Sequence, residues 1–324
     1  MTERSTIFEG IQIGVETTPG TLVAASKKLL AMTVEVGVKP EVDVYRPTGS
    51  KFATVTALAK EWVEGSISGP LSYTDIVYPL SSIISTATPT GAGASKTWTF
   101  SSNPDGPDTN KTFTIEGGSS GRAHRFGYGL VTAFTRTFTR DECTASGSIL
   151  GQALEDDVTI TPTPTAVTLV PIQPTEVLVY FATTRAGLTG ATALARTFSV
   201  VASLTNRFGP VWALNGQVGF AAHTELAPTA EYSILMAADD EGMAQLAKMR
   251  TGDTIWMKVV AIGGIIESSI HYSYTETAAI RITNASPFRD EGGIYAIEWT
   301  GTAVKDATWG KAFEIVVVNS VAAL

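Results

Sequence analysis

A stretch of alternating side chains between residues 34 and 67 constrains the fold of this chain more than any other feature. Valines recur at every second position over much of Val34–Val44, and the residues between them are polar or glycine. Such period-two patterning is typical of a β-strand with one buried face. A turn signal follows at Pro47-Thr48-Gly49, and Phe52–Val63 has the composition of a return strand. The sequence therefore predicts a long β-hairpin, Val34–Ile67, which needs support because an isolated two-stranded ribbon is marginal in water.

The second half of the chain repeats landmarks of the first at a displacement of roughly 167 residues, the scale of one domain. Ser66-Ile67 corresponds to Ser233-Ile234, and Gly49 corresponds to Gly216. The preserved order favours a tandem duplication, although single identities of this kind also arise by coincidence. A counterpart hairpin is then expected at Phe198–Ile234.

A Thr/Pro-rich stretch separates the two halves and resembles a semi-extended linker. We therefore predict a first β domain at residues 1–160, a linker at 161–173 and a second β domain at 174–324. The expected fold class is mainly β, with two tandem β-sandwich or open-barrel domains. Each domain is expected to contain one long hairpin and one short helix.

Two helix patterns stand out. The first begins near Thr74-Asp75, and Pro79 implies a late start or a kink. The second begins at Asp239-Asp240, where carboxylates suit both the cap and the helix dipole, and ends at Gly252. It is expected to bury one face, made of Met243, Leu246, Ala247 and Met249.

Composition and charge limit the classes of function. Charged residues make up only 17% of the chain, which is low for a monomer with a fully solvated surface and fits a protein that buries its outside against copies of itself. A β-rich domain with a Ser/Thr surface would also fit. The formal net charge of −8 argues against a duplex-binding groove but allows a conduit through which DNA passes without sticking. Met1–Gly20 lacks a secretory pattern, and no stretch reaches the length of a membrane helix.

No catalytic or metal-binding constellation is present in the sequence. His124, His223 and His271 lack partners at metal-ligand spacing, although His223 and Glu225 can share one strand face. The single cysteine, Cys143, excludes an internal disulfide framework and is expected to be buried. Gly91–Thr97 lacks the second glycine of a phosphate-binding loop and is expected to be a flexible loop. We therefore expect a protein that is not an enzyme and has no cofactor or metal.

One locally basic, glycine-rich segment spans Gly117–Arg125. Its Arg122, His124 and Arg125 are candidates for a flexible loop that reaches a neighbouring subunit or a phosphate backbone. A mobile hairpin tip is the alternative.

Landmarks in the order found along the chain resemble the major tail tube protein of long-tailed bacteriophages. Gly14–Thr21 resembles the opening segment of that family, and Gly65–Leu71 resembles the segment before its helix. The remaining landmarks are Trp98-Thr99-Phe100, Pro104, Thr112–Glu116, Pro287, Gly292–Tyr295, Glu298-Trp299-Thr300, Asp306 and Gly310-Lys311-Ala312. The resemblance covers most of the chain and rests on order and spacing.

The resemblance implies a structural virion protein whose rings stack into a hollow conduit for viral DNA. Most members have one such domain and form hexameric rings, so two tandem domains imply trimeric rings with pseudo-sixfold symmetry, with hexamers as the alternative. The implied partners are other copies of the chain, a tape measure protein and tail tip and terminator proteins, with DNA in passage and no membrane. The implied location is the phage tail, with assembly in the host cytoplasm.

Within such a ring, Val34–Ile67 and Phe198–Ile234 are expected to form the inner wall, because pairing between neighbours removes exposed sheet edges. Candidate lumen or inter-ring residues on the first hairpin are Glu41, Asp43, Arg46 and Lys51. A solvated hairpin explains these four residues equally well. Glu16–Lys28 and the linker are expected to make contacts between rings.

A second function from a different class remains open. A two-domain β protein can also recognise a receptor or a carbohydrate at a tail tip or cell surface, through an aromatic patch near Trp212, Trp256 or Trp309. Tryptophans of this kind are more often part of a core. Ring assembly and glycan binding distinguish the two hypotheses.

Overall fold

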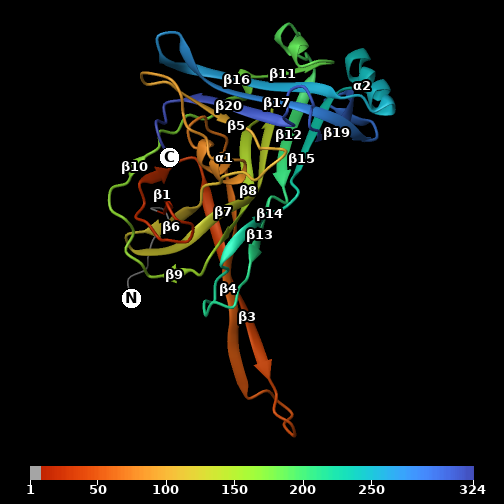
Figure 1. Ribbon diagram of the computed structural model, residues 1–324. Coiled ribbons are helices and arrows are strands. Elements are labelled where there is room, and N and C mark those ends of the chain that lie inside the picture. The colour runs from red at the N-terminus through yellow and green to blue at the C-terminus, as the bar shows by residue number, and fades with distance from the viewer. Residues whose placement is uncertain (1–8) are drawn as a thin grey trace.

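The computed structural model describes residues 9–324 and shows a mainly β protein from which one long hairpin projects (Figure 1). Residues 1–8 of the predicted first domain lie outside the described residues. The elements of the first half are β1 (Gly10–Val15), β2 (Lys27–Leu29), β3 (Thr33–Tyr45), β4 (Val55–Pro70), α1 (Val77–Ile83), β5 (Lys96–Phe100), β6 (Phe113–Ser119), β7 (Arg122–Thr139), β8 (Cys143–Gly151) and β9 (Glu155–Asp156).

The rest of the chain runs from the predicted linker to the C-terminus. Its strands and helices are β10 (Thr165–Ala166), β11 (Val177–Ala182), β12 (Thr197–Thr205), β13 (Phe208–Val211), β14 (Ala222–Glu225), β15 (Thr229–Ala237), α2 (Asp240–Thr251), β16 (Ile255–Glu267), β17 (Ile270–Ala285), β18 (Arg289–Glu291), β19 (Ile294–Ala303) and β20 (Phe313–Asn319). Two short 3-10 helices lie at Pro174–Glu176 and Ala186–Thr189.

The hairpin predicted from the alternating valines is confirmed as β3 and β4. Val34 lies opposite Ile67 in the antiparallel register. Gly49 has a φ of 87°, a left-handed conformation that glycine adopts without steric cost and that lets the chain reverse. The return strand begins at Val55 instead of Phe52. We call residues 33–70, with their connecting turn, the first ribbon.

The counterpart hairpin is formed by β12 and β15, in which Val200 lies opposite Ile234. β13 and β14 extend this hairpin toward its tip, where Gly216 has a φ of 74°. We call residues 197–237 the second ribbon. Both ribbons therefore turn at a left-handed glycine, and each carries a Val–Ile pair near its base.

The two halves share one strand order. In the first half, hydrogen-bonded neighbours follow the order β1, β6, β7, β8, β4, β3. In the second half they follow the order β11, β16, β17, β19, β15, β12. A helix follows the second strand of the ribbon in each half. Repetition of five pairings and a helix in the same order is the structural signature of two equivalent units.

The halves are joined by strand pairing and by a shared core. The C-terminal part of β7 lies between β8 and β12, and β20 pairs with β5. Arg136 on β7 forms a buried ion pair with Glu276 on β17, with 2.8 Å between Nη2 and Oε1. Tyr232 also donates to Glu276 Oε1, at 2.8 Å. One cluster of buried apolar side chains extends through both halves.

The predicted linker is tied to the first half. Thr165 and Ala166 form β10, which pairs in parallel with β2. Val167 and Ile172 are buried in the core cluster, and the Ile172 N–H donates to the carbonyl of Leu71 at 2.8 Å. The division into domains at residues 160 and 174 stays a prediction.

The second helix matches its sequence signals, and the first has the late start that Pro79 implied. α2 has Asp239 as its N-cap, accepting from the Gly242 N–H, and it ends at left-handed Gly252. Ala247 was expected inward and is exposed. Helix α1 begins at Val77, after Thr74-Asp75. It is buried on every side, so it has no polar face to mark its boundaries.

The Gly91–Thr97 loop encloses a carboxylate from the other half of the chain. Glu267, on the β16–β17 hairpin, accepts from the backbone N–H groups of Ala94 and Ser95 at 2.9 and 2.8 Å and from the Ser95 hydroxyl at 2.6 Å. The Ser95 hydroxyl and these N–H groups lower the pKa of Glu267 to about 2. The loop predicted to be flexible is thus bound to β16.

Candidate assembly surfaces

Several strand edges have no strand partner within residues 9–324, and two of them belong to β3 and to the end of β17. β3 pairs along one side only, with β4. The Arg281–Ala285 segment of β17 pairs with β19 alone, whereas Ser273–Ala278 of the same strand lies between β16 and β20. Unpaired edges expose backbone donors and acceptors that can recruit another strand.

The chain already contains one junction of the kind that these two edges can make. β12 is the counterpart of β3, and β7 is the counterpart of β17, because the halves share one strand order. β12 pairs antiparallel with β7 from Ser199 opposite Thr139 to Leu204 opposite Phe134. By strand order, the free edges of β3 and β17 are therefore the counterparts of the two edges that meet at this internal junction. A head-to-tail contact of this type produces a ring when its rotation closes.

The second ribbon also packs against one face of the first half. Phe220 near its tip is only 1% exposed, and its ring lies 4.8 Å from that of Tyr128 on β7. Gln152 Nε2 donates to the Phe220 carbonyl at 2.8 Å. Trp212, on the other side of the tip, makes an edge contact with Trp62 of the first ribbon at 5.5 Å. Phe220 and one side of the second ribbon are therefore covered by the chain's own first half, while Leu214 at its tip stays exposed.

The first ribbon is covered much less. Figure 1 shows its outer part extending away from the body. Its exposed large apolar side chains are Val38, Val42, Val44, Tyr45, Phe52, Val55 and Leu58. Soluble monomers rarely expose contiguous apolar surface, so a surface of this kind marks an interaction site.

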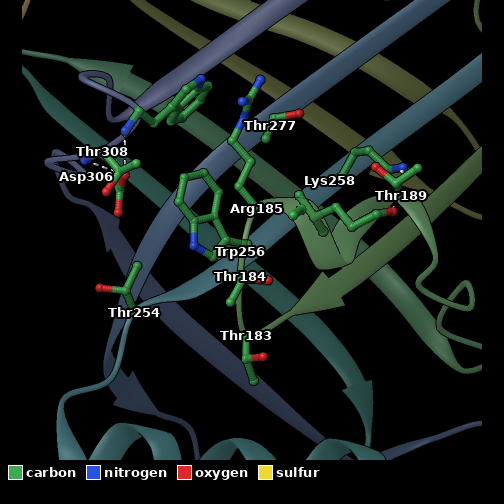
Figure 2. Close-up of a pocket in the computed structure, with 13 residues that line it drawn as sticks. Thr183, Thr184, Arg185, Thr189, Thr254, Trp256, Lys258, Thr277, Asp306 and Thr308 are labelled. Carbon is green, nitrogen blue, oxygen red and sulfur yellow. Dashed lines mark hydrogen bonds between the residues drawn. The ribbon is translucent and has the colours of Figure 1, made fainter.

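A cleft of about 840 Å³ lies on one face of the second half. The rings of Trp256 on β16 and Trp309 lie 5.2 Å apart at this cleft. Figure 2 shows Trp256, Arg185 and Lys258 among the lining residues. The guanidinium carbon of Arg185 lies 5.1 Å from the Trp309 ring, and Lys258 Nζ lies 4.4 Å from the ring of Tyr180. The cleft thus combines aromatic surface with cations held by aromatic faces.

Comparison with known proteins identifies the family. The sequence model of the family described as "Phage tail tube protein" matches residues 9–308, which is nearly the whole chain. The chain belongs to the phage tail tube protein family. No curated protein matches the sequence. Among solved structures, one similar chain comes from the tail tube of SPP1, with 11% identity, a TM-score of 0.33 and coverage of 47% of this chain and 80% of that chain.

The four residues predicted at the lumen or between rings lie along the first ribbon of this tail tube protein. Glu41 forms an ion pair with Lys60 at 2.9 Å, and Asp43 accepts a hydrogen bond from the Tyr45 hydroxyl at 3.3 Å. Arg46 and Lys51 are exposed on either side of the tip. The structure places the four on one ribbon, and their role in the tube stays a prediction.

The basic segment predicted as an inter-subunit loop forms the β6–β7 hairpin of this tail tube protein. Arg122 forms an ion pair with Asp156 of β9, and Arg125 forms one with Glu155. His124 lies between them, and burial lowers the pKa of its imidazole. These residues lie on a paired strand, and their contact with a neighbouring subunit stays a prediction.

Within residues 9–324, no cluster of His, Cys, Asp and Glu has the arrangement of a metal site. In the same range, no helix has both the length and the apolar character needed to cross a membrane. Cys143 is buried, and burial raises the pKa of its thiol to about 11, which makes it a poor nucleophile.

Sequence reasoning missed Arg207, which fastens the base of the second ribbon to the first half. Its Nε donates to the carbonyl of Ile83 at the end of α1, at 3.0 Å. Its Nη2 contacts Asp108, and also Glu225 at 2.9 Å. The three contacts join segments that lie far apart in sequence, so no local spacing signals them. Glu225 thus forms its ion pair with Arg207, and His223 contacts the Tyr128 hydroxyl instead of Glu225.

His223 makes the second ribbon sensitive to acid. Its Nδ1 lies 3.0 Å from the Tyr128 hydroxyl. Burial lowers its pKa, and the charge of Arg207 acts in the same direction while Glu225 opposes it. Folding therefore favours the neutral imidazole. The stability that the neutral imidazole of His223 contributes is fully present above the unfolded-state pKa of about 6.5. It is lost as pH falls through the lower pKa of the folded state.

We expect the melting temperature of the wild-type protein to fall between pH 7.5 and pH 5 more than that of a His223→Gln variant, which has no imidazole to protonate. Thermal melts at several pH values measure the difference. His271→Gln serves as the control for replacing an exposed histidine outside the second ribbon. Equal slopes for wild type and His223→Gln would contradict this prediction.

Proposed function

We propose that this tail tube protein forms closed rings that stack into a hollow conduit for viral DNA. The observation that carries the proposal is the pair of unpaired edges, β3 and Arg281–Ala285 of β17, which are the counterparts of the paired strands β12 and β7. Pairing β3 of one copy with β17 of the next repeats the internal junction between chains. It also removes both free edges, which are otherwise sites of uncontrolled association.

The ring is proposed to contain three copies with pseudo-sixfold symmetry. Each chain supplies two units of the same strand order, so three chains provide six ribbons and alternate three internal junctions with three intermolecular ones. A hexamer of chains would supply twelve such ribbons. The shared strand order supports the smaller ring, which needs only one further junction per chain.

The two ribbons are proposed to line the inner wall, with Glu41, Asp43, Arg46 and Lys51 at the lumen or between rings. The net charge of −8 supports a wall that does not retain DNA, because a phosphate backbone binds basic surfaces. A tape measure protein inside the tube and tail tip and terminator proteins at its ends are the proposed partners. Assembly is proposed to take place in the host cytoplasm.

Mass measurement and electron microscopy of the purified protein test the proposal. We expect rings of three times the 34.2-kDa chain mass, and tubes at higher concentration or with tail partners. Rings of six chains would correct the stoichiometry and keep the tube. Monomers that never assemble and that bind a glycan or receptor would instead support the binding-module hypothesis.

A further inference from the structure

The cleft at Trp256 and Trp309 lies on one face of the second half. The equivalent face of the first half is the one at Tyr128, where Phe220 of the second ribbon packs. In the first half, the Gln152 N–H donates to the carbonyl of Gly127 at 3.0 Å. In the second half, the Val304 N–H donates to the carbonyl of Ala279 at 2.8 Å. These two bonds join equivalent strands, β7 to the end of β8 and β17 to the end of β19. They show which face of the second half is equivalent to the face of the first half that binds the second ribbon.

Different parts of the chain cover the two equivalent faces. On the first half, Tyr128 and Leu150 form a buried cluster that is completed by Phe220 of the second ribbon. On the second half, Ala279, Leu188 and Trp256 form the cluster, with Val304 and Trp309 packed at its margin. The open cleft lies beside this second cluster, where no ribbon is docked (Figure 2).

The tip of the first ribbon matches the tip that fills the first site. Trp212 and Phe220 flank the turn glycine of the second ribbon, and Tyr45 and Phe52 flank Gly49 in the first. Phe52 is 78% exposed and Tyr45 is 54% exposed, whereas Phe220 is 1% exposed. The chain therefore has two aromatic-tipped ribbons and two equivalent faces, and only one ribbon and one face meet within the chain.

We infer that the Trp256–Trp309 cleft receives the tip of the first ribbon, with Tyr45 and Phe52, from the next copy in the ring. This inference rests on the proposed ring and adds to it a second contact, separate from the strand edges. The aromatic rings of the tip pack against the two tryptophans, and Arg185 at the cleft rim offers a cation to an aromatic face. Docking of the first ribbon then stabilises each junction between chains, in the way that the packing of Phe220 stabilises the junction within the chain.

Disulfide trapping between two singly substituted proteins tests the contact. A Phe52→Cys protein is mixed with a Thr308→Cys protein, because Thr308 is exposed at the cleft. Oxidation is expected to give a covalent dimer of the two variants, since a disulfide forms only when the two Cα atoms lie within about 7 Å. A Leu214→Cys protein replaces Phe52→Cys as the control, because Leu214 is fully exposed at the tip of the other ribbon. It should not couple.

A truncation measures how much the contact contributes. Phe52→Ala is expected to raise the protein concentration needed for ring formation by about tenfold, as loss of a buried aromatic anchor does. It should leave the melting temperature of the monomer unchanged, because Phe52 is exposed there. Leu214→Ala is the matched control and should change neither quantity. Assembly is followed by sedimentation of a dilution series.

The outcomes separate this inference from the proposed ring. Rings that form normally with Phe52→Ala and give no disulfide between positions 52 and 308 would overturn the cleft contact and leave strand pairing intact. Failure of the wild-type protein to form any ring would overturn both. A glycan that binds the cleft in the assembled ring would also overturn the inference, because the tip would then be elsewhere.

Discussion

Replacing Val38 by Asp is expected to abolish ring assembly while the monomer stays folded. Val38 lies four residues after Val34 on β3, as Leu204 lies four residues after Val200 on β12. Leu204 is 3% exposed at the internal junction with β7, whereas Val38 is 41% exposed because its edge has no partner. In the proposed ring, Val38 becomes buried against β17 of the next copy.

An unpaired carboxylate buried at that junction costs several kcal/mol, so assembly should weaken by at least about 100-fold. Val38→Leu should retain ring formation, because Leu is the residue at the equivalent internal position. Leu169→Asp is the control for an added charge, since Leu169 is 43% exposed in the linker, away from both edges. Analytical ultracentrifugation measures assembly, and circular dichroism measures folding. Normal rings of Val38→Asp would refute pairing through β3.

The parts of the fold that the sequence predicted are those with local signals. The first ribbon is marked by alternating valines and a turn glycine, and α2 is marked by Asp239 and Gly252 at its ends. The start of α1 was predicted only as near Thr74-Asp75 or later, because a helix that is buried on every side lacks the polar face that normally marks its boundaries. Local chemistry therefore specifies elements at the surface better than those in the centre of the core.

The assembly surfaces were predicted only in outline. Their general location on the first ribbon followed from its length, but the face that receives it depends on contacts between distant residues. Glu267 reaches Ser95 across 172 positions, and Arg136 reaches Glu276 across 140. Neither pair has a spacing that a single sequence can reveal. The segment Gly117–Arg125 forms the β6–β7 hairpin, which is the hairpin alternative that its glycines allowed, and its contact with a neighbouring subunit stays a prediction.

The second large effect concerns the buried ion pair that joins the halves. Glu276 is completely buried, and its carboxylate accepts from Arg136, Tyr232 and Tyr274. The charge of Glu276 opposes the effect of burial on Arg136 and keeps the pKa of the guanidinium above its usual range. Both tyrosine hydroxyls have pKa values raised by burial first and by the Glu276 charge second. The carboxylate therefore depends on a single cation and two neutral donors for its compensation.

Removing the Arg136 cation alone should lower the free energy of unfolding far more than removing both charges of the pair. Arg136→Met is expected to lower the free energy of unfolding by about 3–5 kcal/mol, because it leaves Glu276 charged and buried without a counter-ion. Combining it with Glu276→Gln should restore most of the loss, since the glutamine is neutral and can still accept from the tyrosines. Urea denaturation of the wild type, both single variants and the double variant gives the coupling energy. If Arg136→Met lost less than about 1 kcal/mol, the ion pair would contribute little to holding the two halves together, and the strand junctions and the shared core would do so without it.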